Sequence, residues 1–297
     1  MQTTHIDPPR VWPACGHCAQ PARRLFTGLL AGAALLPVAA QAQELPECRR
    51  SRAAGFVPAQ QVETAAQQQY AQMLREAQGA NALVAASDPQ MQRLRYIAAR
   101  MVPFTPACNE RARQWRWEVN LLNSKQINAF CMPGGKIAFY TGILQQLQLN
   151  DDEVAMIMGH EVAHALLEHA RERMAKSGGT ELALRGAAAL FGLGNLGDLA
   201  AQGATQLLSL KFGRQDESEA DSLGLLLAAR AGYDPAAGIS LWQKMGKATG
   251  GKAPPQWLST HPAGEARIRD IQSKLPAVQP LFAQAAKPDR RFNPPQG

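Results

Sequence analysis

The sequence predicts an α+β fold that is mostly helical, with a small sheet containing a β-hairpin beside one long helix. Hydrophobic residues make up 46% of the 297 residues and are largely Ala and Leu, whereas aromatics reach only 6%. This composition favours helices over sheet. Strand-like and hairpin patterns fall between residues 115 and 140. The charged fraction of 19% is compatible with a packed core and excludes a disordered or coiled-coil chain.

Residues 1–42 are predicted to be a signal peptide that is removed on export. The basic pair Arg23 and Arg24 precedes an uncharged run over residues 25–40, and a small-x-small pattern ends at Ala42, where we expect the cut. A retained membrane anchor is the alternative, although the run is short for a spanning helix. The basic pair loosely matches a twin-arginine signal, so the export route stays open. We therefore expect an exported, periplasmic protein.

The cysteines are consistent with an oxidising compartment. Cys15 and Cys18 lie in the leader, which leaves Cys48, Cys108 and Cys131 in the mature chain. Such a compartment permits one disulfide, and Cys48–Cys108 is the first pair to test. The pairing itself stays open at this stage.

The first elements of the mature chain are helical. Residues 43–87 are predicted to form an extended entry segment followed by a Gln- and Ala-rich helix over residues 60–86. Asp88 is expected to cap a second helix, with Pro89 at its first position and its end near Pro103.

A strand over residues 115–122 and a hairpin are predicted next. Ile127–Cys131 and Lys136–Tyr140 flank a Met-Pro-Gly-Gly turn and read as paired strands. Asn150 is then expected to cap a long helix that runs to about Arg173.

The rest of the chain is predicted to be helical, followed by a loose tail over residues 276–297. Helices are expected, in chain order, over residues 181–210, 214–231, 235–247 and 264–274. The first of these contains Arg185, Asn195 and Asp198, which argue against a membrane span.

The predicted long helix carries the motif His160-Glu161-x-x-His164. Residues four apart lie on one helix face, about 6 Å apart along the axis, so both imidazoles can reach one Zn²⁺. Glu161 lies beside the same cavity, where it can take a proton from a zinc-bound water. The alternative is a solvated His-Glu face, but the surrounding positions are apolar, and an uncompensated buried charge is costly.

A hydrolytic zinc site needs a third protein ligand and one open position. Leu167 and Ala170 exclude the metzincin continuation of the motif. Carboxylates remain in the cluster over residues 216–221, where Glu217 and Asp221 are four apart and share a helix face. One of them could bind the metal while the other accepts a hydrogen bond from a ligand imidazole.

Together these residues resemble peptidase family M48, which includes HtpX and the CAAX prenyl proteases. Four blocks occur in the family's order and cover roughly residues 88–275, namely the strand and turn Asn128–Gly135, His160-Glu-x-x-His164, Glu217-Ser-Glu-Ala-Asp221, and Thr260-His-Pro262 with Arg267.

The resemblance implies a zincin-like fold over residues 88–275 and one zinc ion per chain. It implies Glu217, not Glu219, as the third ligand, with Asp221 hydrogen-bonded to a ligand imidazole. The chain looks most like the compact exported bacterial branch of the family, without membrane-spanning helices or tetratricopeptide repeats.

Three further side chains complete the expected site region. His261 could polarise the scissile carbonyl, steady the oxyanion or occupy the open zinc position. Arg214 precedes the acidic cluster and could pair with it. His169 is about 180° around the predicted helix from His160, so we expect it on the surface.

The strand containing Asn128, Ala129 and Phe130 is expected to bind an extended peptide by adding it as a further strand. A core hairpin with no such role is the alternative. Pairing through the backbone gives weak side-chain specificity, which suits an enzyme that cleaves unfolded chains.

We therefore expect a zinc metalloendopeptidase that acts on unfolded or misassembled envelope proteins, with Glu161 as general base. The alternative is a zinc-stabilised periplasmic chaperone that binds such proteins without cutting them. Polypeptides are the expected partners, together with peripheral contacts at the membrane or its outer-membrane assembly machinery. The net charge is +7, but Lys and Arg are scattered rather than clustered, which argues against a nucleic-acid partner.

Overall fold

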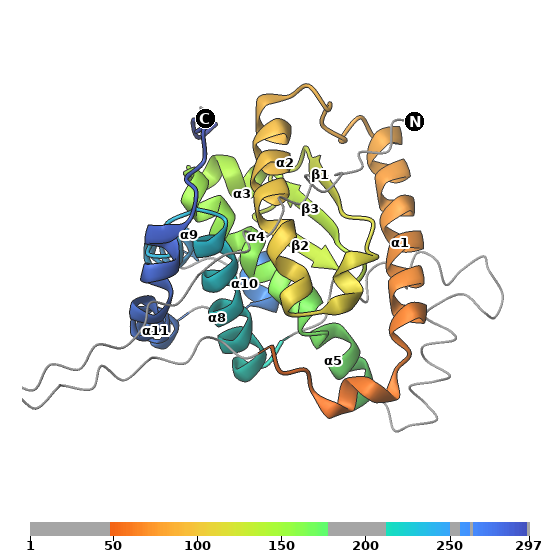
Figure 1. Cartoon of the computed structure of the whole chain (residues 1–297). Helices are drawn as coiled ribbons and strands as arrows, with labels where there is room; N and C mark the ends of the chain where they lie inside the picture. Colours follow the sequence, from red (N-terminus) through yellow and green to blue (C-terminus); the bar gives the residue numbers. More distant parts are fainter. Residues whose placement is uncertain (1–47, 178–211, 250–255, 262–263, 296–297) are drawn as a thin grey trace, which may run out of the picture.

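The computed structural model describes residues 48–177, 212–249, 256–261 and 264–295. The predicted leader and the predicted helix over residues 181–210 lie outside these ranges. The described residues form helices around a three-stranded sheet (Figure 1), so the predicted α+β, mostly helical class is confirmed.

The sheet has the strand order β1-β3-β2, with β1 at Glu118–Leu122, β2 at Ala129–Met132 and β3 at Lys136–Tyr140. β3 pairs antiparallel with β2, which confirms the predicted hairpin, and parallel with β1. The turn depends on Gly135, whose φ is +76° and where a Cβ would lie 2.8 Å from the Trp117 ring. β2 is thereby left at one edge of the sheet.

The two faces of the sheet pack against different helices. Phe130, Met132 and Ala138 share a small core with the helix α1 (Ala59–Gly79), and the alternate positions of β2 and β3 join the main core beneath α2 and α4. α1 ends before residue 86, its predicted end, because Asn81 takes a φ of 54° and Leu83 then bridges to Leu122.

The N-terminal segment is tied to the body of the molecule near the end of α2 (Pro89–Met101). The Asp88 side chain accepts hydrogen bonds from two amides of α2, as predicted. Two 3-10 helices follow, η2 at Val102–Ala107 and η3 at Glu110–Arg113. Cys48 and Cys108 form a disulfide, which confirms the first pair to test, and Cys131 is free and buried.

The predicted single helix from Asn150 to Arg173 is wrong, because the structure divides it into two. Asn150 and Glu153 form a capping box at the start of α4 (Asp151–Leu166). Glu168 then takes a left-handed φ of 60°, and α5 (His169–Ser177) leaves in a new direction. The Asn109 side chain donates to the Leu166 carbonyl at 2.9 Å and stabilises the end of α4.

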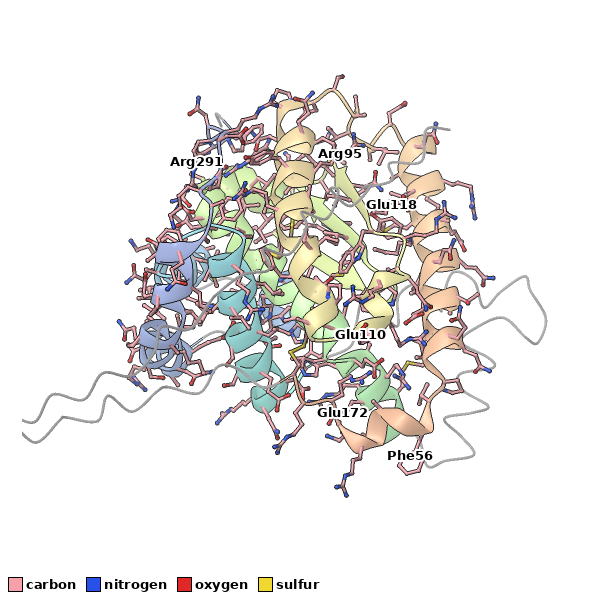
Figure 2. The ribbon with its side chains drawn as sticks, in the orientation of Figure 1. Phe56, Arg95, Glu110, Glu118, Glu172 and Arg291 are labelled. Carbon is pink, nitrogen blue, oxygen red and sulfur yellow. A yellow bond between two sulfur atoms is a disulfide. The ribbon has the colours of Figure 1, made fainter. Side chains whose placement is uncertain are left out.

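α5 packs against the short helix η1 (Arg52–Phe56). Figure 2 shows Phe56 of η1 and Glu172 of α5 at the same end of the molecule. The Arg171 guanidinium donates from Nε to the Val57 carbonyl at 2.9 Å, which joins the two elements.

α8 (Arg214–Arg230) lies directly on α4 through two glycines. A Cβ on Gly159 would lie 2.8 Å from the Gly224 carbonyl oxygen, and a Cβ on Gly224 would lie 2.9 Å from the His160 amide nitrogen. The two backbones therefore touch at a point where side chains would separate them.

The remaining helices of the described part of the chain are α3 (Thr141–Gln146), α9 (Ala237–Thr249), α10 (Gln256–Thr260) and α11 (Glu265–Gln284). The expected loose tail is wrong for residues 276–284, because α11 continues through Pro276 and Pro280. Its buried Ile271 and Val278 pack into the core, which offsets the amides that proline lacks.

The last described residues also lie against the protein rather than extending from it. The Phe292 amide donates to Asp151 Oδ2, and Arg291 Nη1 pairs with Asp152 Oδ1, both at 2.9 Å (Figure 2 labels Arg291). Among the described helices, none is both long and apolar enough to cross a membrane.

Candidate metal centre

Four buried side chains from three parts of the chain converge at the centre of the molecule. His160 and His164 come from α4, Glu217 from the first turn of α8, and His261 from the residue after α10, and one ligand atom of each lies within 4.8 Å of the others. The His160 Nε2 atom is 3.0 Å from His164 Nε2 and 3.2 Å from His261 Nδ1. The Glu217 Oε1 atom is 2.9 Å from His261 Nδ1.

This donor set fits a zinc ion. An unprotonated ring nitrogen is a hydrogen-bond acceptor, so two of them facing each other at 3.0 Å need a proton or a cation between them. Four donors at about 2.0–2.1 Å from a tetrahedral Zn²⁺ would lie about 3.3 Å apart, close to the separations seen here. His160, His164 and Glu217 could therefore hold zinc, as expected, and His261 faces the same point.

A buried charge network surrounds His160. The His160 Nδ1 atom lies 3.0 Å from Oδ1 of Asp221, the carboxylate that the sequence places beside a ligand imidazole as an expectation. The Arg267 guanidinium contacts both acids at 2.5 Å, through Nε to Asp221 Oδ2 and through Nη1 to Glu217 Oε2. Its Cζ atom lies 3.7 Å from the centre of the Trp242 ring.

The ionisation of these groups follows from their contacts. Burial raises the pKa of Glu217, but hydrogen bonds with the three histidines outweigh this and hold it well below the usual range. Burial also raises the pKa of Asp221, and the Arg267 charge more than reverses the effect. Burial lowers the pKa of His160, but hydrogen bonds with Asp221 and Glu217 raise it to about 9. The pKa of His164 is well below its usual value because burial dominates there.

Glu161 is held by an indole that the sequence reasoning missed. The Trp257 Nε1–H donates to Glu161 Oε1 at 2.6 Å, and the Trp257 ring stacks on Trp242 with centroids 5.2 Å apart. His261 Nε2 lies 3.6 Å from the same carboxylate oxygen. A tryptophan at this position gives no sequence signal, because the contact joins residues 96 apart.

His169 is buried, so its expected place on the surface is wrong. Its ring is 1% exposed, and its Nδ1 atom lies 2.8 Å from His164 Nδ1. The reason is the break at Glu168, which removes His169 from the helical phase of α4 and turns it back toward the site. Phe212 was also missed, and its ring stacks on His164 with centroids 4.0 Å apart.

Arg214 does not join the site. It is exposed at the first residue of α8, and the arginine that contacts Glu217 and Asp221 is Arg267. Arg173 pairs with Asp216, the other acid at the start of this helix, and its Nε donates to Asp216 Oδ2 at 2.8 Å.

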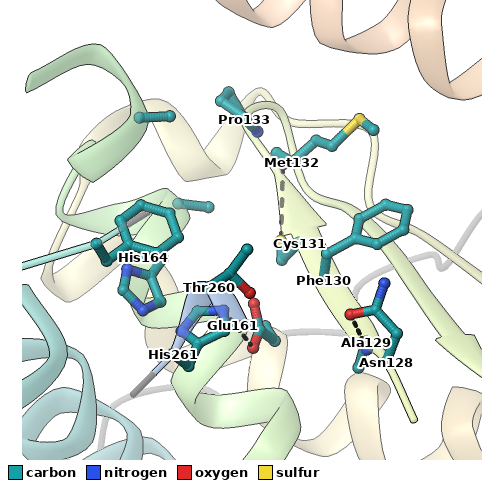
Figure 3. A pocket seen from close by; sticks show the side chains of 13 residues that line it. Asn128, Ala129, Phe130, Cys131, Met132, Pro133, Glu161, His164, Thr260 and His261 are labelled. Carbon is teal, nitrogen blue, oxygen red and sulfur yellow. Dashed lines mark hydrogen bonds and ion pairs between the residues drawn. The ribbon is translucent and has the colours of Figure 1, made fainter. Parts of the chain in front are cut away.

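A pocket separates the donors from the edge strand β2. Asn128, Ala129 and Phe130 line one side of it. Figure 3 shows Glu161 and His261 on the opposite side, facing β2. The peptide-binding segment expected from the sequence therefore lies beside Glu161 and the metal donors.

Comparisons with known proteins agree with this geometry. The sequence model of the family described as "Peptidase family M48" matches residues 88–275 of this chain. The mitochondrial metalloendopeptidase OMA1 of Arabidopsis thaliana is 41% identical over 153 residues, which are 52% of this chain and 30% of that protein. OMA1 of Schizosaccharomyces pombe is 37% identical over 170 residues, 55% of this chain and 48% of its own.

The β-barrel assembly-enhancing protease of Escherichia coli is 28% identical over 176 residues, which are 56% of this chain and 36% of that protein. The chain thus spans less than half the length of each of these relatives. The family match covers most of the chain and contains all four donor residues. The chain belongs to peptidase family M48, whose metalloproteases use zinc.

Proposed function

We propose that this chain is a zinc-dependent endopeptidase that hydrolyses peptide bonds in unfolded polypeptides. The observation that carries the proposal is the position of Glu161, a buried carboxylate beside four convergent metal donors. His160, His164 and Glu217 would hold the metal. When bound, zinc supplies Lewis-acid chemistry by lowering the pKa of water and polarising the scissile carbonyl.

Glu161 is the general base in this proposal. The Trp257 Nε1–H bond fixes Glu161 Oε1, which leaves Oε2 to take the proton of the attacking water. The same carboxyl group then protonates the leaving amine, so one residue moves the proton across the reaction. The hydrogen bond from the Trp257 indole to the Glu161 carboxylate is charge-assisted, and it orients the carboxylate before substrate arrives.

His261 is the candidate for stabilising the oxyanion. Its Nδ1 atom is 2.9 Å from Glu217 Oε1 and its Nε2 atom is 3.6 Å from Glu161 Oε1. The ring therefore lies between a metal donor and the base, where a donated hydrogen bond can reach the carbonyl oxygen under attack.

The edge strand β2 supports a substrate that binds in extended form. Asn128, Ala129 and Phe130 lie across the pocket from Glu161, and a peptide added to this edge would place a main-chain carbonyl near the metal donors. Because main-chain pairing reads little of the side chains, we propose unfolded or misassembled envelope proteins as substrates.

The proposed location is the periplasm, after removal of residues 1–42. The leader pattern supports export, and the Cys48–Cys108 disulfide supports an oxidising compartment. The E. coli relative is named for β-barrel assembly, which supports our proposal of contacts at the outer-membrane assembly machinery.

The first test is Glu161→Gln in the full chain. We expect the variant to fold and to keep one zinc per chain. Its rate of cleavage of unfolded casein should fall at least about a thousandfold, because the general base is gone. The readouts are zinc content and casein cleavage, with a chelator-treated sample as control. Cleavage that persists in the variant would overturn Glu161 as base. A wild-type protein that holds zinc and binds casein without cutting it would instead favour a chaperone.

A further inference from the structure

The break between α4 and α5 places a second histidine behind one of the metal donors. We propose that His169 is a positioning residue that holds the ligand His164 in its zinc-binding state. In this proposal a series of hydrogen bonds runs from His164 through His169 to Glu219, which is the final acceptor. This inference rests on the proposed zinc site and adds two residues to it. Glu219 lies within the block Glu217-Ser-Glu-Ala-Asp221 and His169 lies outside the four blocks, and the family resemblance gives neither residue a role as ligand or base.

The two nitrogens of His164 face different partners. Its Nε2 atom points to the metal donors, 3.0 Å from His160 Nε2 and 3.4 Å from Glu217 Oε1. Its Nδ1 atom points away from them and lies 2.8 Å from His169 Nδ1. His164 would therefore bind metal through Nε2, and Nδ1 is the atom through which the protein controls the ring.

The positions of the protons follow from this geometry. A neutral imidazole that binds a metal through Nε2 carries its proton on Nδ1. That proton can be donated to His169 Nδ1, so the His169 proton lies on Nε2. The His169 Nε2 atom is 3.3 Å from Glu219 Oε2, and the carboxylate accepts there. The hydrogen bonds that link His164 to His169 and His169 to Glu219 thus select one tautomer and one orientation of His164.

A role in packing alone does not account for His169. The ring is 1% exposed, and a buried imidazole in an apolar setting needs hydrogen bonds for its nitrogens. Both nitrogens face polar partners, one of them a metal donor. Glu219 is further oriented by Gln215, whose Nε2 donates to Glu219 Oε1 at 2.8 Å. His169 and Glu219 are thus both placed where they can orient the ring of His164.

The experiment measures zinc affinity by competition with a chromophoric chelator, using the full chain. His169→Leu removes both hydrogen bonds while keeping an apolar side chain, and we expect zinc to bind about 10- to 100-fold more weakly. His169→Asn restores a polar atom near the position of Nδ1, and we expect it to recover affinity to within about threefold of wild type. The thermal unfolding of the zinc-free proteins is measured in parallel.

Two further variants make the test independent of folding defects. Glu219→Gln changes a side chain that is 39% exposed, so it disturbs packing little, and we expect a loss of about three- to tenfold. The matched control is Glu172→Gln, with wild-type zinc affinity expected. Glu172 is a buried acid on α5, the helix that carries His169, and it pairs with Lys176.

The outcomes separate this inference from the proposed function. A wild-type protein that binds no zinc would refute the proposed function. If wild type binds zinc, wild-type affinity in Glu219→Gln and in any folded His169→Leu protein overturns the inference. The inference is also overturned if His169→Asn binds zinc as weakly as His169→Leu does. That result would mean that both variants lose affinity through lost packing rather than lost hydrogen bonds. A graded loss, with the control unchanged, supports it.

Discussion

The two ligand histidines of α4 are supported by different kinds of partner. His160 rests on Asp221, which is itself paired with Arg267, and all three are buried. His164 contacts the ring of His169, which in turn contacts the partly exposed carboxylate of Glu219. One side of the site is thus a closed set of charges, and the other leads outward to solvent.

The difference separates stability from tuning. Removing one member of a buried ion pair leaves an uncompensated charge, which is strongly destabilising. Water can replace part of the support that a half-exposed carboxylate provides, so a change at Glu219 is expected to alter metal affinity more than folding. The side at His160 should therefore be intolerant of change, and the side at His164 should be adjustable.

The largest effect is expected from breaking the closed side with Arg267→Met. This change leaves the buried Asp221 without its guanidinium, and we expect the free energy of unfolding to fall by about 3–5 kcal/mol. Urea denaturation of the zinc-loaded protein measures it. Arg214→Met is the matched control, because Arg214 is exposed at the start of α8, and it should stay within about 0.5 kcal/mol of wild type. Equal stability of the two variants would contradict the comparison.

A smaller effect is expected at the indole that joins the base to the closed side. Trp257 stacks on Trp242, which lies under Arg267. Trp257→Phe keeps a ring for stacking but removes the hydrogen bond to Glu161, and we expect kcat to fall about tenfold with zinc content and KM unchanged. Trp242→Phe is the control, with kcat close to wild type. A fall in zinc content in Trp257→Phe would show that the ring acts on the metal instead.

The smallest and most specific effect is the proton released when zinc binds. With a pKa of about 9, zinc-free His160 is protonated at pH 7.5, whereas the lowered pKa of His164 leaves that ring neutral. Zinc should therefore displace about one proton from the two rings, not two, and its affinity should rise about tenfold per pH unit between about pH 7 and 9. Calorimetric titration in buffers of different ionisation enthalpy counts this proton, and a release of two would remove the distinction between the rings.

The same shift has the opposite sign for the stability of the zinc-free protein. The folded pKa of His160 lies above its value of 6.5 in the unfolded chain. Its contribution to stability is therefore complete below about pH 6.5 and is lost as the pH rises toward 9. Zinc affinity and zinc-free stability should change in opposite directions over this range.

The parts of the site that sequence predicts are those encoded locally. The spacing of His160 and His164 needs only the helical repeat, and Asn150 and Asp88 mark helix starts through hydrogen bonds to amides two or three residues away. Glu217 as third ligand came from the family resemblance, since residue spacing alone left Asp221 equally open.

The missed features depend on contacts between distant segments. The break at Glu168 has no Gly or Pro to announce it, and it depends on Asn109, 57 residues before Leu166. Burial of His169 follows from that break. Trp257 and Phe212 reach the site only when the segments that carry them have folded beside α4. Arg267 was named by the family resemblance without a contact, and it reaches Glu217 and Asp221 only after α11 has packed on α8.

The glycine contact between α4 and α8 means that the spacing of the metal donors is fixed by backbone against backbone. Gly159 immediately precedes His160, and Gly224 lies two turns of α8 beyond Glu217. A methyl group added at either glycine would act as a wedge between the two helices that carry the donors. Substitution of either glycine is therefore expected to disturb the metal site, because it would change the spacing of the donors, although neither glycine can itself bind a metal ion.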